Sequence, residues 1–156
     1  MNRICALVMC VLLCPALSVS APDPWEKDVV KTSAGDLEIT FIGHGSLMMA
    51  FSGKTIYVDP FGKLADFQKF LKADLVLLTH HHGDHLDVKT LDQLVTEKTT
   101  IFLTRKCADE YKKGVVMKNG DVQTVFGITV EAVPAYNLIH KRPDGSVFHP
   151  KGEGNG

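Results

Sequence analysis

Cysteine is scarce in this sequence, and most of it lies where it cannot hold a mature fold together. Of the four cysteines, Cys5, Cys10 and Cys14 fall within the first 20 residues, and only Cys107 lies beyond them. One remaining cysteine cannot form an intrachain disulfide. A packed core, a metal ion or both must therefore stabilise the domain.

An excess of positive charge is also absent. The chain carries 17 basic and 18 acidic residues over 156 positions, a formal net charge of −1. Proteins whose main partner is nucleic acid normally present a basic face, so we expect no nucleic-acid partner. A small-molecule substrate, which could be anionic, is compatible with this balance. With 45% hydrophobic residues, the chain can bury the core of one domain.

Long hydrophobic runs are absent after residue 20, but one lies before it. Arg3 precedes an apolar stretch over residues 4–13, and small residues at 18–20 follow. This order is typical of a secretory signal peptide, which we predict over residues 1–20. We therefore expect a secreted or periplasmic protein with no stable membrane span after cleavage. An uncleaved membrane anchor is the alternative, although the apolar stretch is short for a span.

The rest of the chain predicts a sheet covered by helices. Residues 21–35 are expected to be an irregular lead-in, because Pro22 and Pro24 block regular structure. Apolar periodicity predicts strands at 37–41, 47–51, 55–58, 74–78 and 100–103, helices at 63–72, 88–95 and 105–113, and a hairpin at 121–125 and 128–133. Asp87 is the expected N-cap of the second helix. The fold class is therefore α/β, layered in the α+β manner.

Four potential metal ligands follow the apolar run at 75–78. They form the pattern His80-x-His82-x-Asp84-His85. His80 and His82 point the same way if the backbone is extended, and Gly83 would let the chain turn so that the other two face a neighbouring position. Imidazole and carboxylate groups suit zinc, and also manganese or iron. The pattern predicts two ions a few ångströms apart, with hydroxide bridging them as the nucleophile.

A plainer interpretation of this loop is also available. Histidines in a polar loop could serve only as hydrogen-bonding groups, and a single histidine would favour that interpretation. Four spaced ligands directly after a buried strand favour a metal site. Alternation along the backbone aims His81 elsewhere, so we leave it out of the predicted ligand set.

The HxHxDH pattern after an apolar strand resembles the signature of the metallo-β-lactamase fold. Residues 42–46 (IGHGS), 56–61 (IYVDPF), 133–137 (VPAYN) and 148–152 (FHPKG) resemble one branch, the metal-dependent hydrolases related to ascorbate-6-phosphate lactonase. The resemblance covers residues 36–156. It implies an αββα fold of which this chain supplies the N-terminal lobe and the start of the second lobe.

The resemblance also implies a role for each candidate residue. His80 and His82 would bind one zinc ion, with His149 completing its ligands and His140 as the weaker competitor. Asp84 and His85 would bind a second ion, and Asp84 would also act in catalysis by orienting the nucleophile. His44 and Asp59 would orient the ligands without binding an ion. Their alternatives are a turn histidine and a strand-end cap.

The resemblance implies further elements that the sequence does not contain. A glycine-aspartate-threonine motif and a last histidine would follow, but only His140 and His149 come after His85. We therefore expect a C-terminally incomplete domain over residues 36–156, either a fragment or a truncated gene product. The predicted function is an exported metal-dependent hydrolase of an ester, lactone or phosphodiester. The alternative is an inactive metal-binding half-fold or an interaction module.

Overall fold

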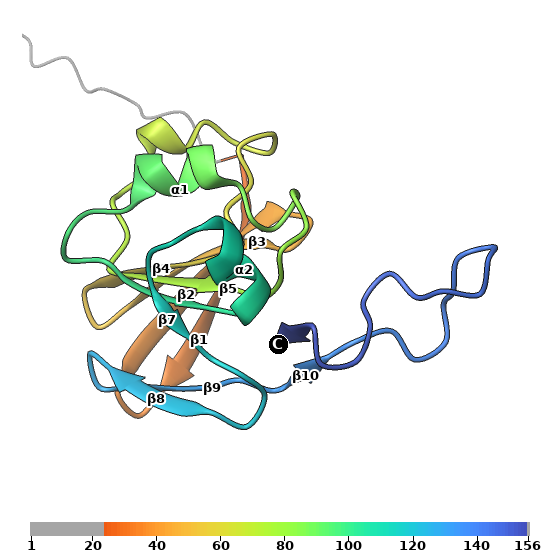
Figure 1. The fold of residues 1–156 in the computed structure, drawn as a ribbon. Coiled ribbons are helices and arrows are strands. Elements are labelled where there is room, and N and C mark those ends of the chain that lie inside the picture. Colours follow the sequence, from red (N-terminus) through yellow and green to blue (C-terminus); the bar gives the residue numbers. More distant parts are fainter. Residues whose placement is uncertain (1–23, 156) are drawn as a thin grey trace, which may run out of the picture.

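A seven-stranded mixed sheet forms the centre of the protein (Figure 1). The fold is seen in a computed structural model that describes residues 24–155, so the predicted signal peptide lies outside the described residues. The first four strands pair with one another in antiparallel fashion, and the fourth to seventh strands pair in parallel. In sheet order they are β1 (Glu26–Thr32), β2 (Gly35–Gly43), β3 (Ser46–Phe51), β4 (Lys54–Val58), β5 (Leu75–Leu78), β6 (Thr100–Leu103) and β7 (Val115–Val116).

Two apolar layers cover the two faces of this sheet. Helices α1 (Val88–Leu94) and α2 (Arg105–Glu110) lie over one face (Figure 1). The hairpin of β8 (Val122–Val125) and β9 (Ile128–Glu131) packs on the other. Strand β5 is buried on both faces, since Val76 belongs to the helix-side core and Leu75 to the hairpin-side core. The predicted layered α/β fold is therefore confirmed.

Local sequence signals placed several of these elements correctly. Asp87 caps α1, because its side chain accepts a hydrogen bond from the backbone N–H of Thr90. Thr104 caps α2 in the same manner through the N–H of Cys107. Cys107 is fully buried, and burial raises the pKa of its thiol, as expected for a packing residue. The hairpin predicted around Gly127 is also present.

The expectation of an irregular lead-in over residues 21–35 was wrong for Glu26–Thr32. This segment is β1, which pairs with β2 along its whole length from Glu26↔Phe41 to Thr32↔Gly35. All of its side chains are exposed. Main-chain pairing across a tight turn therefore makes the strand, and no buried face gives it the alternation that sequence reasoning uses.

The helix predicted over residues 63–72 was also wrong. Only a short 3-10 helix, η1 (Phe67–Lys69), forms there. Phe67 and Phe70 pack against the ring of Tyr57, and the Tyr57 hydroxyl donates to the carbonyl of Leu71. A single 3-10 turn brings residues three apart onto one side, so it satisfies the apolar spacing without a longer helix.

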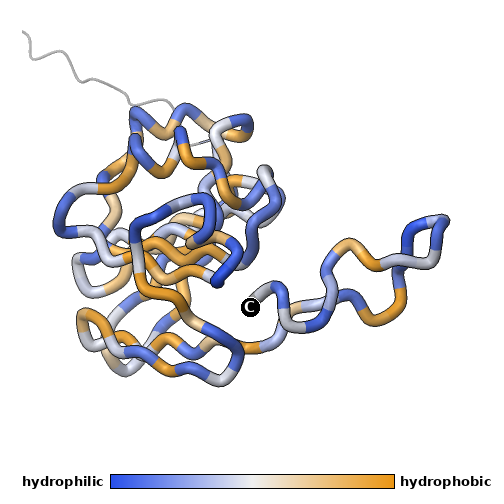
Figure 2. Tube along the Cα trace, viewed as in Figure 1, coloured by the Kyte–Doolittle hydropathy of each residue, from blue (hydrophilic) through white to orange (hydrophobic). Residues whose placement is uncertain are grey.

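The last part of the described chain, residues 133–155, is called the arm below. Strands β10 (Pro134–Ala135) and β11 (Gly154–Asn155) pair at its base, and the loop between them projects away from the sheet (Figure 1). Figure 2 shows apolar residues along the strands of the sheet and again within this projecting loop. Among the helices of residues 24–155, none is long and apolar enough to cross a membrane.

Candidate metal centre

The predicted ligands gather where several strands end. Residues 80–85 follow the carboxyl end of β5, and Asp59 follows the parallel neighbour β4. His44 lies in the turn between β2 and β3, and His149 comes from the arm. Side chains that follow adjacent parallel strands meet at one sheet edge, so the topology brings distant residues together.

Three histidines form the first triad, which is His80, His82 and His149. Each offers one ring nitrogen, and these atoms all lie within 4.8 Å of one another. The ring centroids of His80 and His149 are 4.7 Å apart, and those of His82 and His149 are 5.0 Å apart. Three imidazole nitrogens at this spacing match the protein ligands of a catalytic zinc ion.

The hydrogen bonds of His80 fix which of its nitrogens can bind a metal. The Thr79 hydroxyl donates to Oδ2 of Asp59, so its oxygen accepts from Nδ1–H of His80, 3.0 Å away. That proton on Nδ1 leaves Nε2 unprotonated. Nε2 of His80 is buried and has no hydrogen-bond partner in the described part of the chain. A buried acceptor without a donor is costly, and a cation would satisfy it.

His149 is oriented in the same way from the arm. The Asn137 side-chain oxygen lies 3.0 Å from Nδ1 of His149 and 2.7 Å from its backbone nitrogen. Because an amide oxygen only accepts, Nδ1 carries the proton and Nε2 is again the free nitrogen. Asn137 therefore presents His149 toward the two histidines of the loop.

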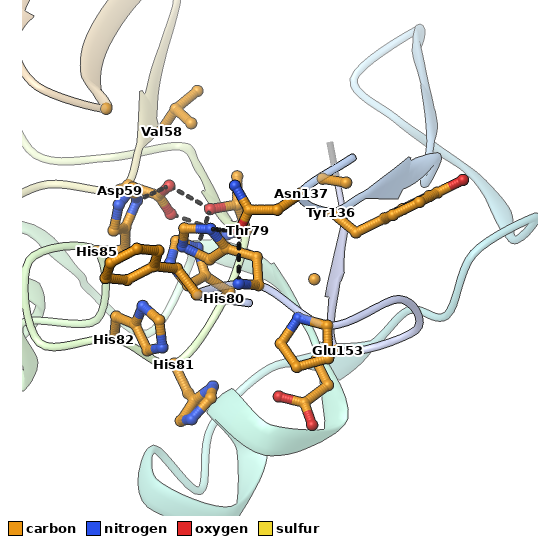
Figure 3. Close-up of a pocket in the computed structure, with 16 residues that line it drawn as sticks. Val58, Asp59, Thr79, His80, His81, His82, His85, Tyr136, Asn137 and Glu153 are labelled. Carbon is orange, nitrogen blue, oxygen red and sulfur yellow. Dashed lines mark hydrogen bonds and ion pairs between the residues drawn. The ribbon is translucent and has the colours of Figure 1, made fainter. Parts of the chain in front are cut away.

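Asp59 connects the supports of both halves of the site (Figure 3). Its carboxylate accepts from the Thr79 backbone N–H at 2.8 Å, from the Thr79 hydroxyl, and from Nδ1 of His85 at 2.8 Å. The residue is 1% exposed. Although Asp59, His80 and His85 also form a compact group, these hydrogen bonds favour a supporting role for the carboxylate, which is the role that the family resemblance implies.

The second triad consists of His44, Asp84 and His85. One ligand atom from each lies within 4.8 Å of the others. Nε2 of His44 is 3.0 Å from Oδ2 of Asp84, and the rings of His44 and His85 are 4.9 Å apart. His44 was expected to orient the ligands without binding an ion, and its Nε2 lies close enough to Asp84 and His85 to form a group that could hold one.

The electrostatics of the site favour the protonation states that bind metals. Burial, followed by the charges of His85, His82 and His149, lowers the pKa of His80 to about 3. Burial is also the largest cause that lowers the pKa of His82. The pKa of Asp84 is lowered despite its burial, because hydrogen bonds and neighbouring histidines favour the carboxylate. Neutral imidazoles beside an ionised carboxylate are the ligand forms that a divalent cation requires.

His85 differs from the other histidines because it has an acidic partner. Burial alone would lower its pKa, but the hydrogen bond and charge of Asp59 raise it overall. In the neutral ring, the hydrogen bond to the Asp59 carboxylate holds the proton on Nδ1, which leaves Nε2 as the free nitrogen. Gly45 makes room for this ring, since a Cβ at Gly45 would lie 2.8 Å from Cε1 of His85.

The turn inside the loop forms differently from the sequence expectation. The N–H groups of His85 and Leu86 both donate to the carbonyl of His82, at 2.9 Å and 2.7 Å. Gly83 does not adopt a positive φ, and a Cβ there would meet nothing within 4 Å. Main-chain hydrogen bonds thus make the turn, and the conformational freedom of glycine is not needed.

All five predicted ligands come together, as two neighbouring groups. Within residues 24–155, neither the exposed His140 nor the partly buried His81 takes part in a triad. The ligand roles themselves stay predictions. Sequence reasoning missed the supporting roles of Thr79 and Asn137. Thr79 directly precedes the histidine loop, which was an available signal. Asn137 lies in the VPAYN motif and its partner His149 in the FHPKG motif, but nothing in either motif shows that the two residues pair across 12 positions.

A cavity of about 390 Å³ opens beside the first triad. Its polar wall contains His80, His82 and His149, and its apolar wall includes Tyr136 and Phe148 of the arm. Figure 3 shows Tyr136 on the far side of the cavity from the histidines. A concave apolar site with a few convergent polar groups is the usual form of a small-molecule site.

Comparison with known proteins agrees with this geometry. A family model described as a beta-lactamase superfamily domain matches residues 38–154. The chain belongs to this family. Among curated relatives, a UPF0173 metal-dependent hydrolase of Flavobacterium johnsoniae is 50% identical over 62 residues, 35% of this chain and 27% of the relative. One from Pyrococcus furiosus is 33% identical over 122 residues, 70% of this chain and 51% of the relative.

Solved structures of this superfamily share the fold. A crystal structure of a protein named as a metal-dependent hydrolase, from Parabacteroides distasonis, is 41% identical with a TM-score of 0.77. It matches over 84% of this chain and 59% of that chain. Igni18, a metallo hydrolase from Ignicoccus hospitalis, is 22% identical with a TM-score of 0.55, and the match covers 74% of this chain and 53% of that chain. The chain therefore spans about half the length of the relatives and solved structures that match most of it.

Proposed function

We propose that the protein is a metal-dependent hydrolase whose two triads hold neighbouring cations. The observation that carries the proposal is a shared hydrogen-bonding pattern. Nδ1 of His80, His85 and His149 is hydrogen-bonded in each case, which leaves Nε2 of each ring for another partner. The buried Nε2 of His80 has no hydrogen-bond partner among the described residues, and it lies within 4.8 Å of ring nitrogens of His82 and His149, where one cation could contact all three.

The donor set suits zinc best, with manganese or iron as further candidates. His80, His82 and His149 would hold one ion, and Asp84 and His85 the other. Bound there, such a cation lowers the pKa of water and polarises the scissile group. The second oxygen of Asp84 can accept a proton from the attacking water and orient it. Asp59 maintains the protonation of His85 and, through Thr79, of His80.

The apolar wall of the cavity supports a substrate with an apolar body, and two cations lie against its aromatic rings without lining the cavity. Tyr136 and Phe148 line it, and each ring has a cation close to its face. Nζ of Lys151 lies 5.5 Å from the Tyr136 ring, and the Arg142 guanidinium lies 4.5 Å from that of Phe148. We infer hydrolysis of an ester, lactone or phosphodiester. The resemblance to ascorbate-6-phosphate lactonase supports the lactone within this set.

Export is a second part of the proposal. Arg3, the apolar stretch over residues 4–13 and the small residues at 18–20 support a signal peptide and a secreted or periplasmic location. Intact-mass measurement of protein recovered from the periplasm or medium tests this directly. A mass that corresponds to loss of about 20 residues supports export. A cytoplasmic protein of full mass contradicts it.

Hydrolysis is tested with the full chain, stripped with a chelator and then reloaded with zinc. Substrates would be p-nitrophenyl acetate, bis(p-nitrophenyl) phosphate and a γ-lactone. We expect zinc-restored turnover of at least one substrate, loss of that turnover in His82→Ala, and parent-like turnover in the exposed control His140→Ala. A folded, zinc-loaded chain that turns over none of the three would instead indicate a metal-binding module without this catalysis.

A further inference from the structure

The turn between β2 and β3 holds a histidine that the sequence pattern did not place among the ligands. We propose that His44 is the third protein ligand of the second ion, together with Asp84 and His85. This inference rests on the proposed two-ion function and deepens it.

The positions of the ligand atoms support this assignment. Nε2 of His44 lies 3.0 Å from Oδ2 of Asp84, and a nitrogen of His85 lies within 4.8 Å of both. Bonds of about 2.0–2.2 Å to a tetrahedral zinc ion imply about 3.3–3.5 Å between ligand atoms. Small side-chain movements therefore convert the observed arrangement into three corners of a tetrahedron. His44 and Asp84 are each about half-exposed, so both side chains have room to make them.

The backbone at His44 has a positive φ, which it shares with Ser52 and Phe126 in the other hairpin turns. His44 has a φ of 49°, in the left-handed region that non-glycine residues rarely adopt. Residues held in this conformation cluster at functional sites. Asparagine or aspartate would be less strained in this conformation. The turn nevertheless presents an imidazole, and that imidazole faces Asp84.

The neighbouring residues hold His85 in the orientation that the assignment needs. Asp59 accepts from Nδ1 of His85 at 2.8 Å, which directs the opposite edge of the ring toward the site. Gly45, next to His44, lets the backbone approach that ring closely, since a Cβ would clash with Cε1. The β2–β3 turn is therefore shaped around both histidines. Its contact with His85 places the His44 ring beside the His85 ring, with centroids 4.9 Å apart.

A competing role for His44 is to orient Asp84 by a hydrogen bond without touching the ion. The two roles differ in ion stoichiometry. Removal of a ligand abolishes or severely weakens one ion, whereas removal of an orienting group weakens it by roughly 10–100-fold and leaves its ligand set intact. They also differ in rescue, because only a ligand role is restored by another zinc-binding side chain.

The experiment uses the full chain with zinc and cobalt(II) as probes. His44→Asn keeps a residue that tolerates the left-handed backbone but is a poor zinc ligand, while His44→Asp keeps the backbone and restores a ligand oxygen. His140→Asn is the matched control on an exposed histidine. Ions per chain would be counted by native mass spectrometry and elemental analysis. The cobalt(II) visible spectrum would report the number of ligands.

We expect the parent and His140→Asn to bind two ions each. His44→Asn should lose the second ion and bind the first as the parent does. His44→Asp should bind two ions again. Two ions of parent affinity and an unchanged cobalt(II) spectrum in His44→Asn would overturn the assignment. A parent that binds only one ion would overturn it while leaving the first triad intact. A folded parent that binds no ion would overturn the proposed function itself.

A direct measurement keeps the assignment testable if His44→Asn does not fold. In the parent labelled with ¹⁵N-histidine, zinc binding should move the Nε2 resonance of His44 to the range of a metal-bound nitrogen. The resonance of His140 should not move. An unperturbed His44 resonance in a chain that binds two zinc ions would contradict a ligand role.

Discussion

The domain body, residues 24–132, and the arm, residues 133–155, are held by different forces. The body encloses two apolar layers, in which residues such as Leu91 and Leu94 are fully buried. The arm leaves Leu138 and Ile139 77% and 82% exposed, and its two short strands pair with each other. Its contacts with the body include the ion pair of Lys106 with Glu153 and the ring contacts of His149 with His80 and His82. Hydrophobic burial thus stabilises the body, while the arm depends on local hydrogen bonds and on the site it completes.

This difference separates the two triads. The second triad, His44, Asp84 and His85, lies wholly in the body. The first triad combines two body histidines with His149 of the arm, so binding of its ion would also fasten the arm to the body. Because ligand binding stabilises the state that binds, the first ion should stabilise the arm and the second should not.

The largest effect should come from a cavity in the body. Leu94→Ala removes a fully buried side chain of α1 and should lower the free energy of unfolding by about 2–5 kcal/mol. The arm control, Ile139→Ala, should change it by less than about 0.5 kcal/mol. Urea unfolding followed by circular dichroism measures both. Equal losses would show that the arm contributes to the core, contrary to the comparison.

Removal of the shared support should affect both triads. Asp59→Ala leaves the Thr79 and His85 donors without their buried acceptor, so it should cost about 1–3 kcal/mol of stability. It should also weaken each ion by roughly 10–100-fold. Asn137→Ala should weaken only the first ion, because Asn137 contacts only His149 of the two triads. Calorimetric zinc titration distinguishes the two patterns, with exposed Asp36→Ala as the control.

Two aspartates with similar bonds provide a matched test of body against arm. Asp87 accepts from the backbone of Gly62 and from the backbone and hydroxyl of Thr90, and Asp144 accepts from the backbone and hydroxyl of Ser146. Asp87→Ala removes a helix cap and should cost about 0.5–2 kcal/mol. Asp144→Ala, in the exposed arm, should change unfolding by less than about 0.5 kcal/mol. Equal costs in thermal melting would contradict the distinction.

The stability that the Asp87 cap contributes should depend on pH. Burial acts to raise the pKa of Asp87, but hydrogen bonds from Gly62 and Thr90 lower it overall. The folded state therefore binds this proton less readily than the unfolded state. The stability contributed by Asp87 is present above the unfolded pKa of about 3.9 and is lost as pH falls through the lower folded value. Urea midpoints should fall less steeply with acid in Asp87→Ala, and parallel curves would contradict this.

The smallest effect should come from the ion pair between body and arm. Nζ of Lys106 on α2 lies 2.7 Å from a carboxylate oxygen of Glu153. Because both side chains are partly exposed, Lys106→Ala should weaken the first ion by at most about fivefold, and less at high salt. The affinity for the second ion should not change. In the exposed-lysine control, Lys141→Ala, neither affinity should change. Zinc titration at two salt concentrations measures this.

Sequence reasoning succeeded where one local signal decided the structure. The apolar run at 75–78 gave a strand buried on both faces, and Asp87 gave the start of α1. It failed where contacts between different elements decided the structure. Strand β1 has no buried face, so its pairing with β2 left no mark in its own sequence. The apolar spacing at 63–72 fitted a helix and a 3-10 turn equally well, and packing on Tyr57 selected the turn.

The sequence by itself determined the ligand types and their order along the loop. Alternation after a buried strand separates His80 and His82 from His81, because successive side chains of an extended backbone point in opposite directions. Tertiary structure decided the rest. It brought His149 to the first triad and His44 to the second. It also placed the Asp59 carboxylate within hydrogen-bonding distance of residues that support both triads. These residues come from different strand ends, and only the pairing of the sheet sets the distances between them.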